Sequence, residues 1–193
     1  MSNNTESENH NIWEQVVHLL NNNEFDEALS VLHNADKDNL VTLEFYGTIY
    51  QGKDDLYRAI NYYKQSCEKG MNYSNHYNLG NALLMDGRFD EAIKVSEKAV
   101  NQYPDHSRAL VTIGQAFFNK NDYRTALDYF HRAEAIEPNY VTVNRKLGRT
   151  YILLGNMEFD NPNSEKGIKY FIKAARMGDR KCQQFLNDNG FNW

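Results

Sequence analysis

Residues 73–104 read YSNHYNLGNALLMDGRFDEAIKVSEKAVNQYP, and residues 107–138 read SRALVTIGQAFFNKNDYRTALDYFHRAEAIEP. In register, the two segments share a glycine, an alanine twelve residues after it and a closing proline. The glycine recurs along the chain at intervals of 33, 34 and 34 residues, at Gly47, Gly80, Gly114 and Gly148. Self-similarity at a fixed period of this length indicates a repeat array.

The residues around these glycines predict antiparallel pairs of helices. In HYNLGNALLM (76–85) and LVTIGQAFF (110–118), apolar residues recur three and four positions apart, which is helical spacing, and no stretch shows sustained strand alternation. Short polar breaks at 86–87 and 119–122 separate the two helices of a pair. We expect the small residues to mark where the paired helices cross and the prolines to end the second helices. One such hairpin cannot bury its apolar face alone, so neighbouring hairpins must stack.

The repeated residues resemble the tetratricopeptide repeat, with its L-G…Y…A…F…A…P signature over 34 positions. The resemblance implies an all-α fold, a right-handed α-solenoid of stacked antiparallel helix hairpins with a C-terminal capping helix. The sequence predicts a disordered tail at 1–8 and one solenoid over 9–193. Its repeats are expected near 9–39, 40–72, 73–106, 107–140 and 141–178, with the capping helix near 179–188.

The first and fifth repeats depart from the pattern. The first has Val16 where the others have glycine, and we interpret it as a degenerate capping repeat. In the fifth, Gly167, Phe171 and Ala174 arrive seven residues late, which places an insertion between its helices, within 156–165. An inserted loop at the edge of a groove could contact a ligand. Because lengthening a surface loop costs little free energy, the sequence favours an insertion that is merely tolerated.

Composition narrows the classes of function. Lys and Arg number 21 and Asp and Glu 26, so the net charge of −5 argues against a general nucleic-acid binder. No run approaches the length of a membrane-spanning helix, and the first residues do not read as a signal peptide. Cys67 and Cys182 suggest neither a disulfide framework nor a metal site, and a reduced, cytoplasmic compartment fits them best.

Motifs that carry chemistry are absent from the sequence. It contains no phosphate-binding loop, dinucleotide glycine fingerprint or nucleophile elbow. The six histidines include no pair at the three- or four-residue spacing that would direct two imidazoles at one metal, so we expect no metal and no cofactor. Carboxylates such as Asp26 and Asp90 are expected near the starts of second helices. The sequence therefore predicts a protein that is not an enzyme.

Function is then expected on a surface, and the resemblance implies which one. In tetratricopeptide proteins the first helices of successive repeats line a concave groove that binds an extended peptide or a helix. Mapped onto the third, fourth and fifth repeats, the expected peptide-binding residues are Tyr77, Asn78, Asn81, Arg108, Thr112, Gln115, Arg145, Lys146 and Arg149.

The charge of this expected groove changes along its length. Glu14 and Glu44 lie at its early end, amides in its middle, and the basic residues gather at its late end. Arg145 and Arg149 are four residues apart, so on a helix they point the same way, and guanidinium groups favour carboxylates or phosphates. We hypothesise a peptide partner whose acidic segment or carboxyl terminus lies near the fifth repeat. The alternative is that these charges pair with acids of the same protein.

One well-known use of the family is a clamp for the acidic tails of large chaperones, in which lysine, asparagine and arginine residues of three first helices hold the tail. In that register this chain has Tyr77, Asn81, Thr112, Thr142 and Lys146, of which Asn81 agrees and Lys146 matches only in charge. The sequence therefore argues against this co-chaperone role.

A second class of function stays open beside peptide binding. The protein could be a self-associating structural or adaptor subunit, a homo-oligomer whose groove holds its own terminus or a second copy. Phe191 and Trp193 are apolar residues at the end of the chain that could dock in this way. We expect them instead to fold back on the capping helix.

Overall fold

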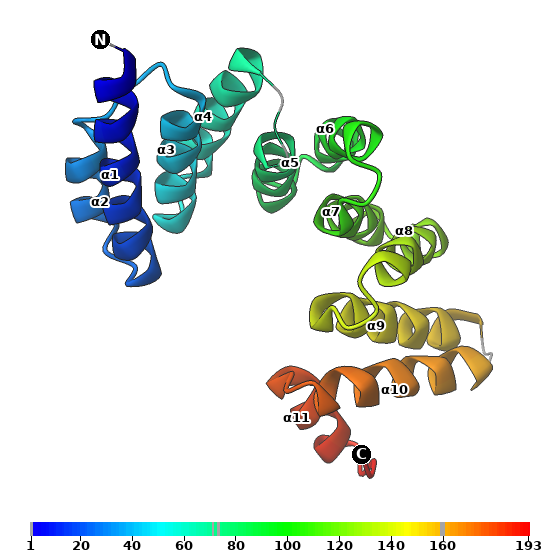
Figure 1. Ribbon diagram of the computed structural model, residues 1–193. Helices are drawn as coiled ribbons and strands as arrows, with labels where there is room; N and C mark the ends of the chain where they lie inside the picture. The colour runs from blue at the N-terminus through cyan, green and yellow to red at the C-terminus, as the bar shows by residue number, and fades with distance from the viewer. Residues whose placement is uncertain (1, 71, 73, 159–160) are drawn as a thin grey trace. The chain divides into compact units, whose positions relative to one another are not determined.

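The computed structural model describes residues 2–70, 72, 74–158 and 161–193. This part of the chain contains eleven α-helices and no strand (Figure 1), which confirms the predicted all-α fold. The helices are α1 (Ser2–Asn21), α2 (Phe25–Leu32), α3 (Leu40–Gly52), α4 (Leu56–Lys69), α5 (Asn75–Met85), α6 (Phe89–Gln102), α7 (Ser107–Asn119), α8 (Tyr123–Ile136), α9 (Val141–Glu158), α10 (Asn161–Arg176) and α11 (Arg180–Asp188).

Helices α1 to α10 form five consecutive hairpins, one for each expected repeat, and α11 lies where the capping helix is expected. The N-terminal segment departs from the sequence analysis, because α1 begins at Ser2 and not after a disordered tail at 1–8. Extending a helix that has already nucleated adds a hydrogen bond for each residue that is fixed, so a polar extension can continue an amphipathic helix.

The chain divides into two compact units, Met1–Val95 and Ser96–Trp193. Within the first unit α2 packs against α3 and α4 against α5, and within the second unit α8 packs against α9 and α10 against α11. Successive hairpins thus stack in chain order inside each unit, as repeats that cannot bury their apolar faces alone must do. A single solenoid over 9–193 stays a prediction.

The turns that join the helices of a pair share one backbone feature. A residue with positive φ follows the first helix in each of the first four hairpins: Asn23 (61°), Asp54 (62°), Gly87 (78°) and Asn121 (64°). Glycine, asparagine and aspartate adopt this left-handed region more readily than other residues do. The polar breaks noted in the sequence at 86–87 and 119–122 are therefore the hairpin turns.

The fifth hairpin lengthens its helices at the corresponding place. Residue 155 aligns with Asn121, yet it lies inside α9, which continues to Glu158. Helices α9 and α10 have 18 and 16 residues, whereas α7 and α8 have 13 and 14. The inserted residues therefore mostly extend the two helices instead of forming a loop, with residues 159–160 outside the described part of the chain.

The glycine column marks close contacts between paired helices, as the sequence predicts. A Cβ atom added to the glycine would lie under 3 Å from an aromatic ring of the second helix in three repeats: 2.5 Å for Gly47 and Tyr63, 2.6 Å for Gly114 and Phe130, and 2.7 Å for Gly148 and Phe171. The ring follows its glycine by 16 residues in the first two cases and by 23 in the third. The contacts thus reproduce the seven-residue shift of the fifth repeat.

Helix α11 covers the end of the last hairpin. Its Cys182 and Leu186 are buried against Phe171 and other apolar residues of α10. Beyond α11, the indole nitrogen of Trp193 donates a hydrogen bond to Asn187 Oδ1 at 3.0 Å, so the tail folds back on this helix as expected. Trp193 nevertheless remains 39% exposed and Phe191 41%.

Candidate functional site

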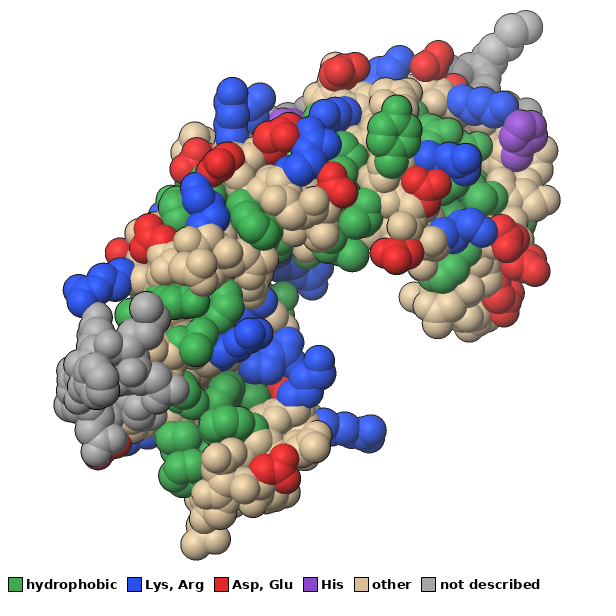
Figure 2. Space-filling view, turned by 180° about the vertical axis from the view of Figure 1, so that it is seen from behind, with side chains coloured by type: hydrophobic (Ala, Val, Ile, Leu, Met, Phe, Trp, Pro, Cys, Tyr) green, Lys and Arg blue, Asp and Glu red, His purple; other side chains and the backbone are tan. Residues whose placement is uncertain are grey.

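A pocket of about 370 Å³ lies in the second unit. Helices α7, α9, α10 and α11 supply its lining, which consists of Gln115, Phe118, Arg145, Lys146, Arg149, Phe171, Lys181, Cys182 and Phe185. We call it the basic pocket. In the lower part of Figure 2, where α9 to α11 lie, Lys and Arg side chains gather beside hydrophobic ones. Four of the nine expected peptide-binding residues meet here: Gln115, Arg145, Lys146 and Arg149.

The other five expected residues are not in the lining of this pocket. Arg108 is exposed on α7, and Thr112 is buried, with its Oγ1 donating to the Arg108 carbonyl at 3.1 Å. Tyr77, Asn78 and Asn81 lie on α5 in the first unit, where all are half-buried. A role for these five residues in binding stays a prediction.

Arg145 is paired within the protein. Its Nη1 lies 2.5 Å from Oδ2 of Asp179, the N-cap residue of α11. The other carboxylate oxygen of Asp179 accepts from the backbone N–H groups of Lys181 and Cys182, each at 3.0 Å. Burial opposes ionisation of Asp179, but these hydrogen bonds and the Arg145 charge outweigh it and hold its pKa below the ordinary value. The alternative of internal pairing is therefore correct for Arg145.

Lys146 has a different environment. Its Nζ donates to Oε1 of Gln115, a neutral acceptor, and no ion pair joins it to an acid in the described part of the chain. Burial, followed by the positive charges of Arg145 and Arg149, lowers the pKa of Lys146 to about 8. Because this value still lies above 7, the amine keeps its charge at neutral pH, although its surroundings disfavour that charge and no carboxylate offsets the cost of burial.

Two further cations belong to the pocket. Arg149 is exposed, and its guanidinium carbon lies 5.0 Å from the centre of the Phe118 ring, a cation–π contact that does not neutralise its charge. Lys181 is exposed on α11. Among the described residues neither side chain forms an ion pair with an acid. Together with Lys146, they leave the pocket with uncompensated positive charge.

Aromatic side chains form the rest of the pocket lining. Phe118 and Phe171 are each 8% exposed, and the half-buried ring of Phe185 packs on Phe171 with centres 4.6 Å apart. Burial, and then the nearby Asp179 charge, raise the pKa of the Cys182 thiol to about 12. This thiol stays protonated at neutral pH and does not supply a nucleophile.

Lys181 and Phe185 were not predicted as pocket residues. Their segment lies outside the repeat pattern, and the sequence indicates only a capping helix there. The signal that could have found them is their spacing, since residues four apart lie on the same face of a helix.

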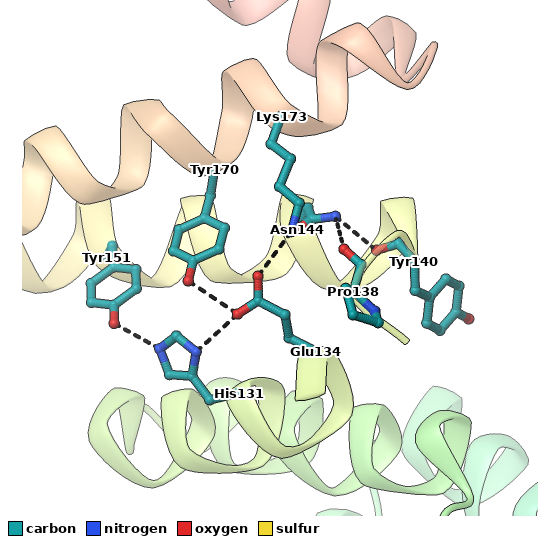
Figure 3. A network of polar contacts seen from close by, with 8 residues as sticks. All are labelled: His131, Glu134, Pro138, Tyr140, Asn144, Tyr151, Tyr170 and Lys173. Atoms are coloured by element: carbon teal, nitrogen blue, oxygen red, sulfur yellow. Dashed lines mark hydrogen bonds and ion pairs between the residues drawn. The ribbon is translucent and has the colours of Figure 1, made fainter. Parts of the chain in front are cut away.

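A network of polar side chains outside the basic pocket connects helices α8, α9 and α10 of the same unit (Figure 3). Glu134 of α8 accepts hydrogen bonds from Tyr170 and Lys173 of α10, each at 3.1 Å, and lies 3.2 Å from His131 Nδ1. The other ring nitrogen of His131 lies 2.7 Å from the hydroxyl of Tyr151 on α9. Burial opposes ionisation of Glu134, but its three donors outweigh burial and lower its pKa. Its charge is compensated, so we interpret the network as structural.

The described ranges contain no group of three or more His, Cys, Asp or Glu side chains that could hold a metal ion. Among the helices of those same ranges, none combines the length and the apolar character needed to cross a bilayer.

The stacked helix pairs define the class of the protein as an α-solenoid of helical repeats. Residues 72–139 match the tetratricopeptide repeat model, and residues 43–71 and 145–179 match the Sel1 repeat model. The chain belongs to the tetratricopeptide-repeat family. The tetratricopeptide match covers the third and fourth repeats, which the sequence analysis started from, whereas the Sel1 matches lie in the second and fifth.

Similar proteins support the same assignment. TPR repeat-containing protein YpiA of Bacillus subtilis (strain 168) is 26% identical over 153 residues, which cover 72% of this chain and 36% of YpiA. The chain thus spans about a third of the length of this relative and less than half of the length of other curated relatives that it matches.

Two solved structures share the fold. PilF of Pseudomonas aeruginosa superposes with a TM-score of 0.80 at 16% identity, covering 97% of this chain and 88% of that one. YrrB, described as a TPR protein with an unusual peptide-binding site, superposes with a TM-score of 0.64 at 21% identity, covering 90% of this chain and 88% of its own. At such identities the likeness shows the fold alone.

Proposed function

We propose that this protein is an interaction module without chemistry of its own, and that it binds an acidic peptide segment of a protein partner at the basic pocket. Proteins with tetratricopeptide repeats bind protein partners, and the description of YrrB names a peptide-binding site. The observation that carries the proposal is Lys146, a charged amine in a pocket with Arg145 and Arg149 and without a carboxylate partner. Cys67 and Cys182 are thiols and not half-cystines, which fits a cytoplasmic setting.

An anion in the pocket would relieve an unfavourable arrangement. The positive charges of Arg145 and Arg149 and the burial of the amine all disfavour the charged form of Lys146. A bound carboxylate would reverse the sign of the local field, and its hydrogen bonds with ammonium and guanidinium donors would be charge-assisted. Because Arg145 already holds Asp179, we assign the contact with the ligand to Lys146 and Arg149.

Peptide-display selection against the full chain tests the proposal. The native protein should enrich acidic peptides, and a variant with Lys146→Glu and Arg149→Glu should not. A matched pair of single changes sharpens the test: Arg149→Gln removes a guanidinium that lies 5.0 Å from an aromatic ring in the pocket, and Arg132→Gln removes one at 5.0 Å from Tyr129 outside it.

We expect Arg149→Gln to weaken binding of a selected acidic peptide about tenfold, as the loss of a charged hydrogen bond does, and Arg132→Gln to leave it unchanged. Equal enrichment by the native protein and the double Glu variant would refute the proposal. So would a selection that yields no acidic peptides.

A specific observation also favours the second candidate function, self-association. Phe191 and Trp193 are exposed apolar side chains at the end of the described chain. If they dock into another copy, the molar mass from light scattering should rise with concentration, and Phe191→Ser with Trp193→Ser should abolish the rise. A mass that stays monomeric at all concentrations would exclude this function.

A further inference from the structure

The basic pocket combines two chemistries that a purely acidic ligand would use only in part. Uncompensated cations, Lys146 and Arg149, share its lining with the aromatic rings of Phe118, Phe171 and Phe185. A ligand with charge alone would leave the apolar wall against water, and a ligand with apolar groups alone would cover Lys146 without neutralising it. The lining therefore favours a ligand that carries both an anionic and an apolar group.

The size of the pocket limits how far apart these two groups can be. Its volume of about 370 Å³ is close to the lower end of the range for ligand pockets, roughly 300–1,000 Å³. It can hold a pair of neighbouring side chains but not a long peptide segment. The acidic and apolar groups must therefore come from adjacent residues.

The capping helix supplies both chemistries. Lys181 and Phe185, four residues apart on α11, both line the pocket. The pair between Arg145 and Asp179 joins α9 to the first turn of α11, which holds this wall in place before any ligand binds. Preorganisation of this kind reduces the entropic cost of binding. Helix α11 is then a specificity element as well as a cover for the last hairpin.

Resting on the proposed function, we infer that the pocket recognises an acidic residue directly adjacent to a large apolar residue, aromatic or aliphatic, in the partner. The carboxylate lies at Lys146 and Arg149, and the apolar side chain packs on Phe185. Acidic segments without such a neighbour are poor ligands.

Four fluorescein-labelled octapeptides in a Gly-Ser background test this inference by fluorescence anisotropy with the full chain. One carries Glu-Phe, one Gln-Phe, one Glu-Ala, and the last carries Glu and Phe at opposite ends. We expect the Glu-Phe peptide to bind at least about tenfold more tightly than each of the others, because burying an aromatic side chain and pairing a carboxylate each contribute about that factor.

Variants of the protein locate the apolar contact. Phe185→Ala should weaken binding of the Glu-Phe peptide about tenfold and leave the Glu-Ala peptide unaffected. Phe185→Leu, which keeps an apolar side chain against Phe171, guards against unfolding of α11 and should retain most of the affinity. Tyr57→Ala is the matched control, because Tyr57 is an exposed aromatic residue outside the pocket lining.

The outcomes separate the inference from the function on which it rests. If all three Glu peptides bind with equal affinity, the adjacency inference is wrong while acidic-peptide binding stands. If Phe185→Ala weakens the Glu-Phe and Glu-Ala peptides equally, the apolar contact is wrongly placed. If the Gln-Phe peptide binds as tightly as Glu-Phe, or if no peptide binds, the proposed function falls as well.

Discussion

Helices α3 and α9 are the first helices of the second and fifth repeats. At the same repeat position, α3 has an acidic residue and α9 a basic one. Glu44 and Arg145 each lie three residues before the repeat glycine. Each contacts the N-cap residue of the following first helix or capping helix: Glu44 accepts from Ser74 Oγ at 2.9 Å, and Arg145 donates to Asp179 at 2.5 Å. This position therefore links consecutive hairpins whatever the sign of its charge.

The two helices differ in what surrounds that link. Glu44 also accepts hydrogen bonds from Ser66 and Asn72, at 3.4 and 2.6 Å. Its neighbour is Phe45, whereas Arg145 is followed by Lys146 and, one turn later, by Arg149. Helix α3 thus uses its one acid, Glu44, in the link, whereas α9 keeps cations beyond the one needed for the link. This surplus of cations, rather than the presence of a charge at this position, is what supports the proposed site in the fifth repeat.

The largest effect is expected where the two repeats are most alike, at the glycine. In Gly148→Ala the new Cβ would meet the Phe171 ring at 2.7 Å and the backbone oxygen of Gly167 at 3.0 Å, whereas in Gly47→Ala the three nearest atoms all belong to the Tyr63 ring. A side chain can move aside more easily than backbone. We expect the free energy of unfolding, measured with urea, to fall by about 3 kcal/mol for Gly148→Ala and by about 1–2 kcal/mol for Gly47→Ala. Equal losses would mean that the backbone contact has no special cost.

The next effect tests the link to the following helix. Asp179→Ala removes two hydrogen bonds to the first turn of α11 and also removes the partner of Arg145. We expect the free energy of unfolding to fall by about 2 kcal/mol. Arg145 is 37% exposed, so most of this loss is assigned to the cap. Ser74 makes no capping hydrogen bond but donates one to Glu44, so Ser74→Ala should lower the free energy of unfolding by about 1 kcal/mol, less than Asp179→Ala does.

The pH dependence of this effect has a definite sign. Folding lowers the pKa of Asp179, so its contribution is present above the ordinary value of 3.8 and is lost as the pH falls through the folded value. The difference in melting temperature between the native protein and Asp179→Ala should therefore shrink as the pH falls into the acid range. A gap that stays constant below pH 3.8 would contradict this account.

The same comparison explains how much the sequence could predict. Side chains at one position of successive first helices face the same way, so the repeat register and the groove that the tetratricopeptide resemblance implies together placed Gln115, Arg145, Lys146 and Arg149 on one predicted surface. The glycine contacts were predictable for the same reason. Lys181 was not, because α11 lies outside the repeat and its placement depends on packing against the last hairpin.

The inserted segment shows a second limit of the sequence. Its Asn, Asp and Pro residues are typical of a loop, yet α10 begins at Asn161, with Pro162 as its second residue. Proline is tolerated in the first turn of a helix, where its missing N–H would have no partner. The spacing predicted the length of the insertion, but local composition did not distinguish a loop from longer helices.

The last stability effect concerns Lys146, a cation of the fifth repeat that the link does not use. Replacing it should raise the free energy of unfolding. Lys146→Met gives the fifth repeat an apolar residue where the second has Phe45, so it should stabilise the protein by about 1–2 kcal/mol at neutral pH while removing acidic-peptide binding.

Below pH 8 the Lys146 amine is charged in both the folded and unfolded states, so the native protein bears the full cost of burying it. Between pH 8 and the ordinary pKa of 10.5 the folded protein loses the proton first, so the native protein becomes more stable relative to the variant. Chemical unfolding across this range should show the stability advantage of Lys146→Met shrinking towards pH 10.5. An advantage that does not change with pH would mean that the charge on Lys146 is already compensated, and the contrast between the second and fifth repeats would no longer support the proposed site.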